Sequence, residues 1–152
     1  MTKVENAITF SKSFSDSKEK GSYILLIGLS EEQTIATGSL KAIYFPRGYY
    51  AYVGSALNGF RARLERHLRN DKKLHWHIDY LLQAASIGNI IICPTENRVE
   101  CIIAQALSRQ FNSIPGFGSS DCKCRSHLFF ATDEIESTIL TTLNLLDIRL
   151  SP

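Results

Sequence analysis

Four tyrosines and one arginine–histidine pair are the first candidates for catalytic residues, judged by residue type and spacing. Tyr23 opens one apolar run, and three more tyrosines lie in the run 49–52. A phenol has a pKa of about 10, so it acts as a base only where a cation stabilises its phenolate. Packing within strands is the alternative for each tyrosine. Arg63 and His67 are spaced as i and i+4, which places both on one helical face. There an arginine can hold phosphate oxygens, and a histidine can position or relay a proton.

Gly54, Ser55 and Glu100 extend this set. Gly54 and Ser55 stand where an aromatic run gives way to a helical pattern, and a glycine at such a junction lets a ligand approach the backbone. Glu100 lies among apolar residues, so its carboxylate needs a partner or a metal ion if it borders the core. One carboxylate, completed by phosphate oxygens and waters, suits Mg²⁺. An ordinary surface glutamate is the alternative, and Glu96 is the nearest rival.

A basic stripe follows the second aromatic run. The stretch 61–73 contains only two acidic residues, Glu65 and Asp71. It contains six basic residues: Arg61, Arg63, Arg66, Arg69, Lys72 and Lys73. The net charge of the chain is only +2, so this local excess is the better sign of a nucleic-acid partner. A solvated helix face is the alternative. Phosphate contacts along such a stripe would make binding fall steeply with salt.

Hydrophobic periodicity predicts the elements that must position these residues. Apolar, β-branched runs predict strands at 23–29, 34–45 with a break at Gly38-Ser39, 49–53, 87–93 and 128–131. Spacings of three and four predict helices from Asn58 (the N-cap) onward and at 74–85, 98–111 and 133–147. The first third is expected to be an antiparallel meander. We therefore expect an α/β fold of the α+β kind, with a small, mostly antiparallel central sheet flanked by helices.

The chain has 152 residues and a hydrophobic content of 44%, which indicates a single globular domain. Residues 1–20 are rich in Ser and Lys and predict a flexible N-terminal flank, so the domain should span 21–152. No apolar run reaches the about 18 residues of a membrane helix, and the start lacks the apolar centre of a secretory signal. We expect a cytoplasmic protein with no membrane partner. Its thiols need not form disulfides, and Cys93 and Cys101 lie in apolar stretches typical of buried hydrophobes.

A cysteine-rich stretch near the end invites comparison with metal sites. Cys122, Cys124 and His127 have the spacing of metal ligands, but a structural zinc site needs four ligands and this stretch offers three. His75 or Cys101 could be the fourth only if the fold brings it near. We therefore do not expect zinc, and favour a glycine-rich loop with reduced thiols that shapes a substrate groove.

The order of these tyrosine, arginine and carboxylate residues resembles that of the GIY-YIG nucleases. The triplet Gly21-Ser22-Tyr23 is similar to their first motif, with serine in place of the central isoleucine, and Tyr52-Val53-Gly54 is similar to the second. The blocks KKLHWHIDYLL at 72–82 and IPGFGSSDCKCRSHLF at 114–129 resemble a branch of these proteins called DUF123. The resemblance covers residues 21–131, with a long insert between the two tyrosine motifs.

The resemblance implies a GIY-YIG-like fold and an endonuclease that hydrolyses DNA phosphodiester bonds with one Mg²⁺ or Mn²⁺ ion. The implied catalytic residues are Tyr23 as general base or water positioner, Tyr52 supporting the water and phosphate, Arg63 stabilising the pentacovalent phosphate, the helical His67, and Glu100 as the single metal ligand. Arg61 is a rival for the role of Arg63, because one extra residue precedes Arg63. The expected substrate-binding residues are Gly54, Ser55, Arg61, Arg66, Arg69, Lys72, Lys73 and His75.

Two functions from different classes fit these residues. The first is the endonuclease, and the alternative is a nucleic-acid-binding module that keeps the fold without useful catalysis. The complete catalytic set favours the enzyme, because binding alone needs basic residues and no buried glutamate. A scaffold whose basic helix binds protein partners is a weaker third hypothesis. Specificity would come from DNA shape, from the insert 30–47, from the loop 113–125 or from a protein partner.

Overall fold

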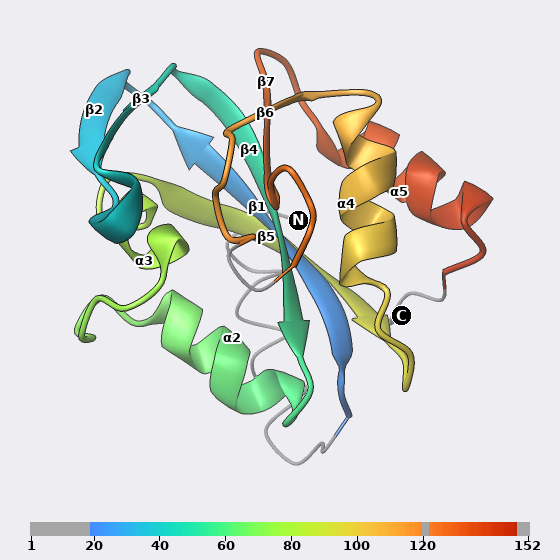
Figure 1. The fold of residues 1–152 in the computed structure, drawn as a ribbon. Coiled ribbons are helices and arrows are strands. Elements are labelled where there is room, and N and C mark those ends of the chain that lie inside the picture. The colour runs from blue at the N-terminus through green and yellow to red at the C-terminus, as the bar shows by residue number, and fades with distance from the viewer. Residues whose placement is uncertain (1–18, 120–121, 149–152) are drawn as a thin grey trace.

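In a computed structural model of the protein, the described residues are 19–119 and 122–148. They form a central sheet with the strand order β5-β1-β4-β7-β6 (Figure 1). Its strands are β1 (Gly21–Leu29), β4 (Gly48–Ala56), β5 (Ser86–Pro94), β6 (Asn112–Ser113) and β7 (Leu128–Ala131). All the pairings in this sheet are antiparallel. The expected α+β fold with an antiparallel central sheet is therefore confirmed.

Helices cover both faces of the sheet, as Figure 1 shows. Helices α2 (Phe60–Leu68) and α3 (His77–Leu81) pack on one face, and α4 (Glu100–Ser108) and α5 (Glu136–Leu145) pack on the other. Strand β1 is apolar at successive positions because its side chains are buried on both sides.

The two tyrosine motifs meet on the face that α2 and α3 cover. Tyr23 of β1 lies opposite Gly54 of β4, so Tyr23, Tyr50 and Tyr52 share one core cluster. Tyr49 points to the other face and is 39% exposed. Neighbouring tyrosines of β4 thus point to opposite faces of the sheet, as the period of two in a strand requires.

The expected meander in the first third is wrong. Strands β2 (Gln33–Ala36) and β3 (Ala42–Phe45) form a separate two-stranded sheet, joined by a short 3-10 helix at Gly38–Leu40. Strands β1 and β4 are apolar on both faces and pair directly in the centre of the large sheet. The β2–β3 hairpin is mostly exposed and contributes only a few side chains to the core, so it stays at the side of the domain.

The start of α2 differs from the prediction. The N-cap is Gly59, with φ of 108°, and Asn58 lies outside the helix without capping it. An added Cβ at Gly59 would be strained by this backbone conformation. The chain therefore turns from β4 into α2 through a glycine, and the helix begins directly at Phe60.

The other helices are shorter than the sequence predicts. The segment expected to be helical at 74–85 contains only α3, because the carboxylate of Asp79 accepts hydrogen bonds from the backbone N–H groups of His75 and Trp76 and holds them outside the helix. Helix α4 replaces the predicted span 98–111, and α5 replaces 133–147. Ile102 of α4 is 50% exposed.

The predicted N-terminal flank lies mostly outside the described residues, because these begin at residue 19. From there the chain is attached to the domain. The carbonyl of Glu19 accepts a hydrogen bond from the N–H of Phe60, and the carbonyl of Lys20 accepts one from Thr95. Among the helices of the described residues, none combines the length and the apolar character needed to cross a bilayer.

Candidate active site

A cavity of about 720 Å³ lies beside the last residues of β4. Strand β7 pairs with β4 only between Tyr49 and Tyr52, and the N–H of Val53 then bonds to the carbonyl of His127. Beyond this point the backbone of β4 borders the cavity. Six of the predicted catalytic or substrate-binding residues line it: Tyr52, Gly54, Ser55, Arg63, His75 and Glu100.

Tyr23 and His67 lie directly behind this wall and do not line the cavity. Both are buried, and the Tyr23 hydroxyl lies 2.7 Å from His67 Nε2. The other ring nitrogen of His67, Nδ1, is buried and has no hydrogen-bond partner among the described residues. The Tyr23 hydroxyl packs against Gly54, where only a glycine leaves room for it, because a Cβ at residue 54 would come within 2.5 Å of that oxygen. The catalytic tyrosine expected from the first motif is thus fully buried beneath the cavity wall.

Burial decides the protonation of this buried pair. It raises the pKa of Tyr23 well above its ordinary value, so the phenol keeps its proton at neutral pH. It also lowers the pKa of His67 to about 3, with further lowering by the nearby Lys72 and Arg63 charges. Protonating His67 at pH 7 would cost roughly 5 kcal/mol. Both residues are therefore neutral in the free protein.

Replacing Gly54 by alanine is expected to destabilise the protein and displace Tyr23. The added methyl group would overlap the tip of the Tyr23 ring, which is packed on all sides. Such overpacking costs about 1–3 kcal/mol, which would lower the melting temperature by roughly 3–10 °C. Gly28→Ala in β1 is the matched control, since no atom of residues 19–119 or 122–148 lies within 4 Å of its added Cβ. Equal melting temperatures for the two variants would contradict the tight approach of Tyr23 to Gly54.

Arg63 enters the cavity from α2 beside an aromatic ring. Its guanidinium carbon lies 4.4 Å from the centre of the Trp76 ring, and that of Arg66 lies 4.2 Å from the same centre. Arg66 is in turn bound through both terminal nitrogens to the two oxygens of Asp79, at 2.7 and 2.8 Å. Burial alone would raise the pKa of Asp79. The ion pair with Arg66 and the hydrogen bonds that the Asp79 carboxylate accepts from backbone N–H groups instead lower that pKa to about 2. The ion pair therefore persists at neutral pH and supports Trp76 against Arg63.

Glu100 reaches the cavity from the first turn of α4. Its side chain is 28% exposed, and Oε2 lies 3.9 Å from Nδ1 of His127. The rival Glu96 is 86% exposed, lies 3.5 Å from Lys20 and is not among the cavity residues. A single half-exposed carboxylate beside an open cavity fits a Mg²⁺ or Mn²⁺ ion that keeps several waters. Of the two glutamates, Glu100 is the one placed to hold such an ion.

The family of the chain is decided by comparison with known proteins. A family model described as "Domain of unknown function DUF123" matches residues 22–147. The chain belongs to the DUF123 family. No curated protein and no solved structure gives a match. The DUF123 branch inferred from the blocks 72–82 and 114–129 is therefore confirmed, and the wider likeness to the GIY-YIG nucleases stays a prediction.

The basic stripe of this DUF123 protein does not form one surface. Only Arg63 of the six basic residues lines the cavity, and Arg66 is engaged by Asp79. Lys72 donates hydrogen bonds to the carbonyls of Arg66 and His67, so it caps the end of α2. With Arg69 it lines a different hollow of about 440 Å³. Arg61 lies 3.1 Å from Glu65 on the exposed side of α2.

Several cavity residues of the DUF123 protein were not predicted as site residues. They are Ser39, Leu57, Asn58, Trp76, His77, Arg98, Cys101, Gly118, Cys122 and His127. His77 links two of the walls, since its Nδ1 accepts a hydrogen bond from the N–H of Gly118 and its Nε2 lies 3.1 Å from the Ser39 hydroxyl. In the sequence, the alternating polar residues His75, His77 and Asp79 were the signal that could have pointed to His77. Only the fold shows that Asp79 is buried while the two histidines line the cavity.

The predicted roles of the cysteines need one correction. Cys93 is fully buried, as expected of a small hydrophobe, and burial raises its pKa to about 12. Cys101 is only half-buried and lines the cavity, so its predicted role as a buried hydrophobe is wrong. It follows Glu100 in the first turn of α4, and both residues line the cavity.

Proposed function

We propose that this DUF123 protein is a divalent-metal-dependent endonuclease that hydrolyses DNA phosphodiester bonds, as the resemblance to the GIY-YIG nucleases implies. One observation carries the proposal. Tyr52, Arg63 and Glu100 come from a strand and two helices on opposite faces of the sheet, and all three line one cavity. Folding and nonspecific binding do not require this convergence, whereas phosphodiester hydrolysis needs a cation, a carboxylate and a water-positioning group together.

Arg63 supplies the positive charge for the phosphate. Its planar guanidinium can bond two phosphate oxygens at once and stabilises the charge that grows on them as the water attacks. The ring of Trp76 beside it limits the orientations of the guanidinium. Arg98 lines the cavity from the segment that leads into α4 and provides a second cation for the nucleic-acid backbone.

Tyr23 positions the attacking water, with His67 behind it. In the tautomer of His67 that carries its proton on Nδ1, Nε2 accepts the hydrogen bond of the Tyr23 hydroxyl. Tyr23 is fully buried in the free protein, so substrate or metal binding must open the wall at Gly54 before its phenol oxygen accepts a hydrogen bond from the attacking water. His67 orients the hydroxyl and does not take up a proton, because its pKa of about 3 makes the imidazolium too costly.

Glu100 would hold the divalent ion, with phosphate oxygens and waters as the other ligands. When bound, the ion supplies Lewis-acid charge and lowers the pKa of a coordinated water. In the reaction, the water oxygen bonds to phosphorus while the bond from phosphorus to the opposite sugar oxygen breaks. The products are a phosphate monoester and a free hydroxyl end. The proton lost by the water is balanced by the proton gained at the leaving oxygen.

Cleavage of defined DNA forms tests the proposal. The purified protein is incubated with supercoiled, branched and single-stranded DNA in Mg²⁺, in Mn²⁺ and in EDTA, and binding is measured on the same substrates. We expect cleavage in either metal and none in EDTA. Binding to DNA without cleavage of any form would overturn the nuclease and support the alternative, a non-catalytic nucleic-acid-binding module.

A further inference from the structure

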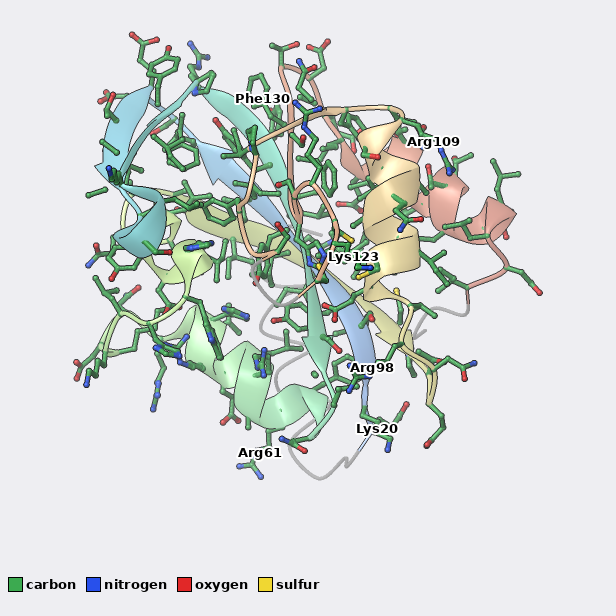
Figure 2. All side chains as sticks on the ribbon, viewed as in Figure 1. Lys20, Arg61, Arg98, Arg109, Lys123 and Phe130 are labelled. Carbon is green, nitrogen blue, oxygen red and sulfur yellow. The ribbon has the colours of Figure 1, made fainter. Side chains whose placement is uncertain are left out.

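We propose that Cys101, Cys122, Cys124 and His127 form a structural zinc site beside the cavity. One ligand atom from each residue, three thiol sulfurs and a ring nitrogen, lies within 4.8 Å of all the others. Figure 2 shows the yellow sulfur atoms gathered between the start of α4 and the loop that carries Lys123. The inference goes beyond the proposed nuclease activity and does not depend on it.

The donor set and its geometry favour zinc. Thiolates are soft ligands and imidazole is a nitrogen ligand that also suits zinc, and the set of three cysteines and one histidine is a recurrent tetrahedral, four-ligand zinc site. The two ring nitrogens of His127 face different partners. Nε2 lies 3.4 Å from the sulfur of Cys122, and Nδ1 faces the carboxylate of Glu100 at 3.9 Å. This arrangement leaves Nε2 for the metal and supports the ring with a carboxylate on its far side, as is usual for zinc-bound histidine.

The fourth ligand comes from the fold and not from local spacing. Cys122, Cys124 and His127 lie in the loop that precedes β7, whereas Cys101 lies in the first turn of α4. The other candidate for fourth ligand, His75, lines the cavity but is not a member of the group of four. The expectation of no zinc rested on three ligands, and this convergence supplies the one that was missing.

A zinc ion here would join the loop to α4 and so fix one wall of the cavity. Upstream of the ligands, the N–H of Gly118 bonds to His77, and a Cβ at residue 118 would come within 2.9 Å of the Tyr52 ring. On the helix side of the proposed zinc site, Cys101 is adjacent to Glu100 in α4. With four protein ligands the site is closed, so the ion holds structure and leaves no position for a substrate.

Zinc content of the purified protein tests the site without any nucleic acid. Metal is measured by mass spectrometry after exhaustive dialysis, for the wild type, Cys101→Ser, Cys124→Ser and Cys93→Ala. We expect about one zinc per chain in the wild type and in Cys93→Ala, which changes a buried cysteine outside the group. The two serine variants should lose nearly all of it. A metal-free wild type, or full zinc in either serine variant, would overturn the proposal.

Cobalt binding provides a second measurement where a serine variant does not fold. Wild-type protein stripped of metal and titrated with Co²⁺ should develop the visible absorption of tetrahedral cobalt with thiolate ligands, with an end point at about one ion per chain. A spectrum without sulfur-to-cobalt charge transfer would overturn the site. Zinc binding without DNA cleavage would count only against the nuclease, and cleavage by a zinc-free protein only against the zinc site.

Discussion

Arg63→Ala is expected to lower the rate of DNA cleavage by about 100- to 1,000-fold while leaving the fold intact. Removal of one group that stabilises charge in a transition state has effects of this size. Arg63 is half-buried, lines the cavity and touches Trp76, and no ion pair joins it to a carboxylate among the described residues. Its loss should therefore change the melting temperature little. Single-turnover cleavage of a plasmid, followed with circular dichroism of the same samples, measures both effects.

Two further arginine variants make this result specific. Arg109→Ala removes the same charge from an exposed position at the end of α4, away from the cavity, and should cleave at the wild-type rate. Arg61→Ala tests the rival for the role of Arg63. Because Arg61 lies beside Glu65 and outside the cavity, we expect only a few-fold effect through DNA binding. A larger loss in Arg61→Ala than in Arg63→Ala would reverse the assignment.

Glu100→Gln is expected to abolish metal-dependent cleavage, again by about 100-fold or more. An amide keeps the size of the side chain and an oxygen that can face Nδ1 of His127, but it removes the negative charge that would hold Mg²⁺. The variant should also need a higher concentration of Mg²⁺ or Mn²⁺ for any residual activity. Cleavage rates across a metal titration measure this shift.

Glu96→Gln is the matched control for this prediction. Glu96 lies four residues earlier, is exposed and lies outside the cavity, so its substitution should leave the rate and the metal dependence unchanged. Zinc content should be measured in Glu100→Gln as well. A variant that cleaves poorly but keeps its zinc has lost the carboxylate function itself. Wild-type cleavage by Glu100→Gln would remove Glu100 from the active site.

The strands of the large sheet were largely predictable from the sequence, because their residues face apolar layers on both sides. The predicted runs 23–29, 49–53 and 128–131 all lie within β1, β4 and β7. The separate β2–β3 sheet was not predictable, because its apolar content resembles that of a central strand and only long-range pairing decides between the two. The predicted length of helix α3 was too great because the carboxylate of Asp79 accepts a hydrogen bond from the backbone N–H of His75. Aspartate side chains that bond the backbone in this way compete with helix formation.

The sequence predicted many of the residues of the candidate site, but it did not predict how their side chains are arranged. The spacing of Arg63 and His67 placed both on one helical face, but the structure buries His67 against Tyr23 and leaves Arg63 at the cavity. Sequence shows that Arg66 is charged and cannot show that it turns toward the buried Asp79. Cys101 was assigned to the core for a similar reason, since only the fold brings it to Cys122 and Cys124.

The single-turnover cleavage rate of Tyr23→Phe tests the central claim most directly. The phenylalanine ring keeps the packing beneath Gly54, and only the hydroxyl that faces His67 is lost. If this hydroxyl positions the attacking water, the rate should fall by about 100-fold or more while affinity for DNA is unchanged. Cleavage by Tyr23→Phe at the wild-type rate would contradict the proposed active site, because the buried tyrosine would then be only a packing residue.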